Sequence, residues 1–162
     1  MFKTTVLIFV LSTSFVQASE ILSCADLSHI SKLGAGDVHF KQIGCDKIER
    51  ETYFQGEAMG DTSTFNISDN WTVININDEY ETVVNNQRWM WSLDKTKIIH
   101  EFTVDTVSKT DGSRDFMSGS DVFEVSNDVV KKSSAFLRRK ETADGNIKTE
   151  SNSTTTELPR LK

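Results

Sequence analysis

The chain has 162 residues, of which 37% are hydrophobic and 26% charged, with a formal net charge of −6 at pH 7. This length suits one domain with a single core. The negative charge disfavours binding to nucleic acid, because affinity for a phosphate backbone comes from Lys and Arg side chains that release counterions. We therefore predict no nucleic-acid partner.

Residues 1–18 have the layout of a cleavable export signal. Lys3 gives a positive start, an apolar run follows over residues 6–16, and small or medium side chains precede a cleavage position after Ala18. The alternative, an uncleaved membrane anchor, needs about 18 consecutive apolar residues, and this run is shorter and interrupted by hydroxyl side chains. We predict a mature chain of residues 19–162, without a transmembrane anchor, that is secreted or periplasmic.

Cys24 and Cys45 are the only cysteines. In an exported chain, two thiols predict one disulfide, because the compartment is oxidising. The alternative is a lipidated Cys24, since the residues before it partly resemble a lipoprotein lipobox. Bulky Leu22 and charged Glu20 depart from that pattern, and the disulfide is favoured.

Residues 23–33 are predicted to form one short helix. Ser23 is placed to cap it, Asp26 stands three residues later where a capping-box acid belongs, and Gly34 supplies a stop. Apolar residues recur between these ends at helical spacing. So short a helix is not stable alone, and we expect the disulfide to tie it to the first strand.

Residues 47–157 are predicted to form a β-meander. Short runs rich in β-branched and aromatic residues are divided by turn pairs, namely Asp69-Asn70, Asn77-Asp78, Asp94-Lys95, Asp111-Gly112, Asn127-Asp128 and Asp144-Gly145. Asn, Asp and Gly accept the left-handed backbone that tight reversals require. This spacing predicts about eight antiparallel strands, followed by a tail over residues 158–162 that holds the only proline.

The clearest alternation places four residues on one face of a strand: Ile98, His100, Phe102 and Val104. An antiparallel meander avoids exposed edges most simply by closing on itself. We therefore predict an all-β, up-and-down barrel or curved half-barrel, with the helix over one end. In strand count and order this resembles the lipocalins in outline only. The nearest match to their Gly-x-Trp motif is Gly36-Asp37-Val38, which lacks the Trp.

No catalytic or metal-binding motif is evident. Ser118-Gly119-Ser120 lacks the glycine frame of a nucleophile elbow, and His29, His39 and His100 are not spaced for zinc. An acidic turn has Tyr80 where a calcium loop needs Gly. We predict no catalytic residue, no metal and no cofactor.

The strongest local feature is Arg88-Trp89-Met90-Trp91, in which both tryptophans project to one face of a strand. Their side chains suit a barrel core or the wall of a cavity. His100 shares its predicted inward face with Phe102, and it is a candidate polar anchor of an apolar pocket. The candidate binding residues are Trp89, Trp91, His100 and Phe102. We expect their bulk to fill most of the barrel and to leave a shallow cleft near His100.

The charge is unevenly distributed. Residues 51–87 hold acids and no Lys or Arg, whereas the segment from Lys131 onward is basic. We favour opposite charges facing each other on neighbouring early and late strands over a basic patch for an anionic envelope component. Asn66, Asn70 and Asn152 lie in glycosylation sequons, which matter only in a host that glycosylates.

The leading functional hypothesis is a non-enzymatic exported domain that binds a small apolar or envelope-derived ligand, or a protein partner. The alternatives are a small secreted hydrolase whose site assembles only in the fold, and a structural or inhibitory protein with a filled core. A pocket without a nucleophile–base pair favours binding, and a Ser or Asp within reach of a His in a cleft favours an enzyme. A molecule with no pocket favours the structural role. Nothing in the sequence indicates the oligomeric state.

Overall fold

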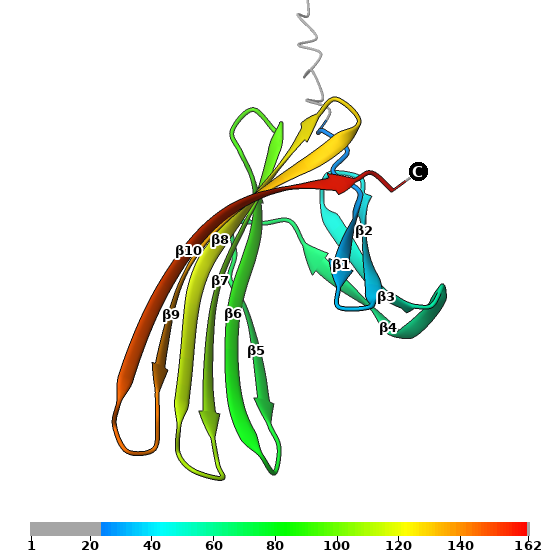
Figure 1. Cartoon of the computed structure of the whole chain (residues 1–162). Coiled ribbons are helices and arrows are strands. Elements are labelled where there is room, and N and C mark those ends of the chain that lie inside the picture. The colour runs from blue at the N-terminus through cyan, green and yellow to red at the C-terminus, as the bar shows by residue number, and fades with distance from the viewer. Residues whose placement is uncertain (1–23, 162) are drawn as a thin grey trace, which may run out of the picture.

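The computed structural model describes residues 24–161, in which every regular element is a β-strand (Figure 1). The smaller sheet has the order β1-β2-β3-β4, with strands His29–Leu33, Gly36–Ile43, Lys47–Phe54 and Glu57–Asn66. The larger has the order β10-β9-β8-β7-β6-β5, with β5 to β10 spanning Thr72–Asn77, Glu81–Trp91, Lys97–Ser108, Arg114–Ser126, Val129–Glu141 and Ile147–Pro159. The predicted all-β, antiparallel class is confirmed. The predicted export signal lies outside the described residues.

The predicted helix over residues 23–33 is wrong, because its second half is strand β1, which pairs with β2. Gly34, with φ of 61°, is the first of two loop residues in a tight hairpin rather than a helix stop. The Asp26 carboxylate accepts hydrogen bonds from the Ser28 amide (3.0 Å) and hydroxyl (2.7 Å), so it forms a local turn instead of a capping box. A few apolar residues at helical spacing do not distinguish a helix from a short strand.

The described part of the chain forms ten strands rather than about eight, because β1 and β2 precede Lys47. All six predicted turn pairs lie in or beside a connection between strands. The last strand includes Pro159, which pairs with Val129 at the end of the outermost strand of the larger sheet. Proline is tolerated there because an edge strand has one side without a ladder partner.

Of the two predicted forms, a barrel or a curved half-barrel, the closed barrel is wrong, because the two sheets stay separate. They meet through two isolated bridges, between His29 and Arg160 on one flank and between Ile67 and Trp89 on the other. Strands β6 to β10 have 11 to 13 residues, whereas β1 to β4 have 5 to 10, so the sheets cannot pair along their whole length. The larger sheet therefore curves and projects past the smaller one (Figure 1), leaving the space between them open at one end.

The hydrophobic core lies where the sheets meet. Its buried members come from both sheets and from the segments that flank them: Leu27, Ile48, Trp89, Ile98, Phe123, Val130 and Leu158. The register places Trp89 opposite His100 and Trp91 opposite Ile98, which confirms that the two tryptophans share the inward face. This packing holds the sheets together at one end and closes the space between them there.

Cys24 and Cys45 form a disulfide, as predicted, with Cα atoms 5.8 Å apart. It links the segment before β1 to the turn between β2 and β3. The Gln42 side chain supports the same junction, accepting a hydrogen bond from the Leu27 amide (3.0 Å) and donating one to the Ala25 carbonyl (2.9 Å). A sulfur in a disulfide cannot carry a thioether-linked lipid, so this bond is incompatible with the lipidated alternative. Over residues 24–161, no helix is long and apolar enough to cross a membrane.

Two bases of the late segment, Lys132 and Arg138, pair with neighbours in the larger sheet, and Arg160 pairs with Asp26 before β1; none of the three pairs with the acids of residues 51–87. Lys132 contacts Asp121 on β8 at 3.1 Å, and Arg138 contacts Asp115 on β8 and Glu150 on β10. Opposite charges do face each other across adjacent strands. The acids of residues 51–87 lie on β3 and β4, in the connection to β5, and around the β5–β6 turn at the far edge of the larger sheet from β9 and β10. The expected pairing between these acids and the late strands therefore does not form.

Candidate functional site

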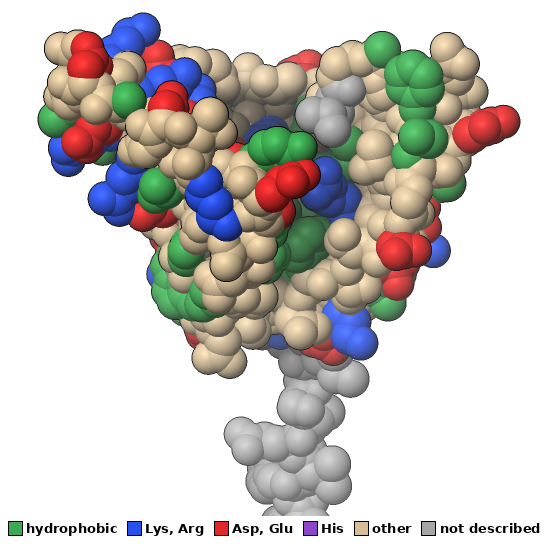
Figure 2. Space-filling view, turned by 90° about the horizontal axis from the view of Figure 1, so that it is seen from below, with side chains coloured by type: hydrophobic (Ala, Val, Ile, Leu, Met, Phe, Trp, Pro, Cys, Tyr) green, Lys and Arg blue, Asp and Glu red, His purple; other side chains and the backbone are tan. Residues whose placement is uncertain are grey.

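A cavity of about 260 Å³ opens between the two sheets beside the core. Seen from below, the molecular surface is hollowed in the middle, and hydrophobic and basic side chains are visible inside the hollow (Figure 2). Four aromatic residues line the cavity, two from each sheet: Phe40, Phe65, Trp89 and Phe123. The volume is close to the lower end of the range for small-molecule sites. We call this space the cleft.

Trp89, on β6, is the central side chain of the cleft. Its ring stacks on His100 with centroids 4.0 Å apart and planes inclined by 16°, and it lies 5.7 Å from Phe65 and 5.9 Å from Phe123. The residue is only 6% exposed. Its indole Nε1 is buried, with no hydrogen-bond acceptor among the described residues. Trp89 thus offers an aromatic surface and one unused donor.

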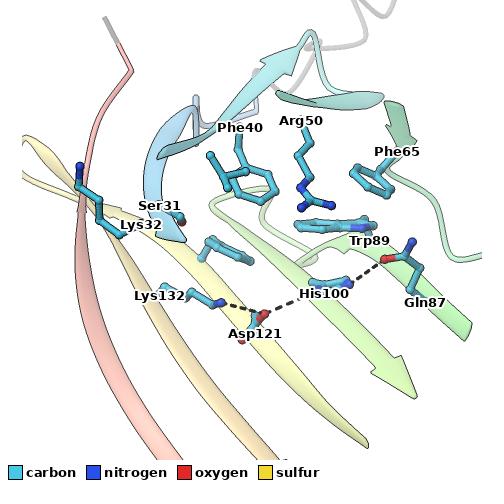
Figure 3. A pocket seen from close by; sticks show the side chains of 12 residues that line it. Ser31, Lys32, Phe40, Arg50, Phe65, Gln87, Trp89, His100, Asp121 and Lys132 are labelled. Atoms are coloured by element: carbon cyan, nitrogen blue, oxygen red, sulfur yellow. Dashed lines mark hydrogen bonds and ion pairs between the residues drawn. The ribbon is translucent and has the colours of Figure 1, made fainter. Parts of the chain in front are cut away.

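A row of polar side chains runs across the floor of the cleft on β6, β7, β8 and β9 (Figure 3). Gln87 Oε1 lies 3.2 Å from His100 Nε2, and His100 Nδ1 lies 3.5 Å from Asp121 Oδ2. The same Asp121 carboxylate accepts a hydrogen bond from the Ser134 hydroxyl at 2.6 Å and pairs with Lys132 Nζ at 3.1 Å. Adjacent strands position these groups because the register places Gln87, His100, Asp121 and Ser134 on one face.

The Asp121 carboxyl is buried and remains ionised. Burial by itself raises its pKa, but the hydrogen bonds from His100 and Ser134 and the charge of Lys132 outweigh burial, and the net direction is downward. The two imidazole nitrogens of His100 face the Asp121 carboxylate and the Gln87 amide.

Three basic side chains line the cleft, and they differ in their partners: Lys32 pairs with Asp37, next to the β1–β2 hairpin. Lys132 is paired with Asp121 and lies 5.6 Å from the centre of the Phe123 ring. Arg50, on β3, extends from the smaller sheet toward Trp89 (Figure 3). Arg50 makes no ion pair with any carboxylate of the described residues. Within residues 24–161, Arg50 is therefore the one Lys or Arg of the cleft that has no carboxylate partner.

The structure brings two of the four predicted binding residues, Trp89 and His100, together in the cleft. Phe102 stacks beside His100 with centroids 5.3 Å apart, but it does not line the cavity. Trp91 packs against the core, and its Nε1 donates a hydrogen bond to the Cys45 carbonyl at 2.8 Å. Trp91 is therefore a structural side chain that packs against the core and does not line the cleft.

Sequence reasoning missed most of the polar residues of the site, namely Arg50, Gln87, Asp121 and Lys132. A signal existed for Asp121, because a hairpin centred near Asp111-Gly112 places it close to His100 in register. The alternation that contains Trp89 likewise gives Gln87 the same face. No local signal exists for Arg50, since it comes from the other sheet.

The arrangement around His100 differs from that of a serine hydrolase. An Asp does lie within reach of a His in a cleft, which is the geometry expected to favour an enzyme. In a Ser-His-Asp triad, however, the hydroxyl bonds to the imidazole, whereas the Ser134 hydroxyl donates to Asp121. Within residues 24–161, no hydroxyl is hydrogen-bonded to His100, and no group of three or more His, Cys, Asp or Glu is placed to hold a metal ion.

The fold and the cleft define an open, two-sheet β-protein with an aromatic and basic cavity between its sheets. Comparison of the chain with protein-family models, with curated proteins and with solved structures finds no match.

Proposed function

We propose that this protein is an exported, non-enzymatic domain that binds a small, largely apolar ligand in the cleft between its two sheets. The observation that carries the proposal is the cleft itself, whose four aromatic side chains surround a row of convergent polar groups. Concave sites with apolar walls and a few placed polar groups are typical of small-molecule binding. The disulfide between Cys24 and Cys45 is compatible with export.

Catalysis is the second candidate, because Asp121 lies close to His100. A hydrolase also needs an activated nucleophile, and the nearby Ser134 hydroxyl is hydrogen-bonded to the carboxylate instead of the imidazole. Binding is favoured over hydrolysis for this reason. A purely structural role requires a filled interior, and the cavity of about 260 Å³ argues against one.

The proposal is tested with phenylnaphthylamine, a neutral apolar dye that fluoresces when it leaves water. We expect the purified protein to bind the dye saturably. Ser31 lines the cleft on β1, whereas its neighbour Ile30 points to the opposite face of the strand. A Ser31→Phe variant should therefore fill the cleft and abolish saturable binding, and Ile30→Phe should bind as the wild type does.

Thermal melts of both variants establish that they remain folded. The proposal is contradicted if the wild-type protein does not bind the dye, or if the folded Ser31→Phe variant binds it as tightly as the wild type. Hydrolysis of a chromogenic ester that is lost in a His100→Asn variant would instead support the catalytic candidate.

A further inference from the structure

We propose that the ligand of the cleft is an amphiphilic carboxylate, held with its carboxylate on Arg50 and its apolar chain against the aromatic walls. This inference rests on the proposed function and names the chemical class of its ligand. It follows from three features of the described residues: the charge of Arg50, the polarity of the space on either side of it, and the unused donor of Trp89.

The charge of Arg50 is not balanced from its own sheet. The pairing of β3 with β4 is irregular between Arg50 and Thr52, but its pairing with β2 is regular there. Side chains therefore alternate along this edge, and Glu49 and Glu51 project to the opposite face of β3 from Arg50. Glu51 accepts hydrogen bonds there from Tyr53 and Thr62. The cross-strand neighbours of Arg50 are Phe40 and Ser63, which are uncharged.

The larger sheet does not balance that charge either. Its one acid in the cleft, Asp121, is already paired with Lys132. Although the whole chain has a net charge of −6, the side chains that line the cleft therefore carry a positive surplus. A planar guanidinium matches a carboxylate through two parallel hydrogen bonds. An anionic group on the ligand would supply the partner that Arg50 lacks.

Arg50 stands between two spaces of different polarity. On one side is the cleft, with its aromatic walls. On the other is a second cavity of about 380 Å³ at the seam between β4 and β5, lined largely by hydroxyl and amide side chains: Ser63, Thr64, Asn66, Thr72, Asn85 and Gln87. Both spaces share four residues, namely Arg50, Phe65, Gln87 and Trp89. This order fits a ligand whose head group faces the polar seam and whose chain enters the cleft.

Trp89 adds a donor at the same junction. Its buried Nε1 has no acceptor among the described residues, and the side chain borders both spaces. A buried donor without a partner is rare in folded proteins. A carboxylate on Arg50 has acceptor sites to spare after a bidentate contact, and one of them can take the indole hydrogen bond.

The test compares octanoate with octanol, which have the same chain and differ in charge, by calorimetric titration of the purified protein. We expect octanoate to bind about tenfold more tightly, as a charge-assisted contact implies. An Arg50→Met variant should reduce octanoate affinity about tenfold and so remove most of the difference in affinity between the two probes. The matched control is Arg139→Met, which removes an exposed charge from β9 outside the cleft and should change neither affinity.

Salt provides a second measurement that needs no variant. Raising the salt concentration should weaken the binding of octanoate to the wild-type protein and leave octanol binding unchanged, because salt screens charge–charge attraction. Equal affinity for both probes, or unchanged octanoate affinity in folded Arg50→Met, would overturn the inference and leave the proposed binding function standing. If neither probe binds, both the inference and the proposed function are contradicted.

Discussion

Gly119, on β8, tests how closely β8 packs against its neighbours β7 and β9 next to the cleft. In most strands a Gly to Ala change removes the entropic cost of glycine, which is about 0.5–1 kcal/mol. At Gly119, however, an added Cβ would lie 2.6 Å from the Ala135 carbonyl oxygen and 2.9 Å from both Phe102 Cζ and Phe136 Cβ. The closest of these atoms is backbone, so relief requires β8 and β9 to move apart. Overpacking of this kind typically costs about 1–3 kcal/mol, and we expect Gly119→Ala to destabilise the protein by about 1–2 kcal/mol.

Urea unfolding followed by circular dichroism measures the change in the free energy of unfolding. Ser120→Ala, at the next position and on the opposite face of β8, is the matched control and should stay within about 0.5 kcal/mol of the wild type. The Gly119→Ala change also presses on Phe102, which stacks on His100, so dye binding in the cleft should weaken. A Gly119→Ala protein that is as stable as the wild type, or more stable, would refute the reasoning.

Three further predictions concern the fold. Replacing Cys24 and Cys45 together by Ala should cost about 3 kcal/mol, because their bond closes a loop with a sequence separation of 21; an unchanged melting temperature would remove the disulfide from the account. Burial lowers the pKa of His29 from its ordinary 6.5, although the hydrogen bond to the Leu27 carbonyl opposes this. The unfolded state therefore binds more protons below pH 6.5, and the free energy of unfolding should fall as the pH drops through that value. His29→Phe should reduce this slope in urea titrations at several pH values, and an identical slope would show that His29 is not its source. Trp91→Phe keeps an aromatic ring but loses the hydrogen bond to the Cys45 carbonyl and part of the ring volume, so it should cost at least about 0.5–1.5 kcal/mol. Trp91→Ala should cost more, about 3 kcal/mol; equal losses would contradict the packing assigned to this side chain.

The strands of the larger sheet could be predicted because the residues that define each strand and turn are close together in the sequence. The alternation from Ile98 to Val104 places one face inward over several residues, and the turn pairs mark each reversal. The error at residues 23–33 has the same origin, because three apolar residues at helical spacing and a following Gly34 suit a helix and a short hairpin equally well. In the structure these residues form a hairpin, because β1 pairs with β2.

Local sequence patterns could not predict whether the sheet closes into a barrel, or which side chains the two sheets bring together in the cleft. A barrel requires matched strand lengths, and the short β1 to β4 cannot follow the long β6 to β10 along their whole length. Trp89 and His100 could be placed together because they share a face of neighbouring strands. Arg50 could not be placed with them, because only the packing of one sheet on the other brings it to the cleft.

The most direct test of binding in the cleft is the indole Nε1–H signal of Trp89 in two-dimensional NMR spectra during titration with octanoate, and separately with octanol. The indole of Trp91 is already bonded to the Cys45 carbonyl, and Trp71 is exposed in the connection between the sheets. Binding in the cleft predicts that the Trp89 signal shifts saturably while the signals of Trp71 and Trp91 stay in place. A Trp89 signal that does not move with either probe, or a shift confined to Trp71, would contradict it.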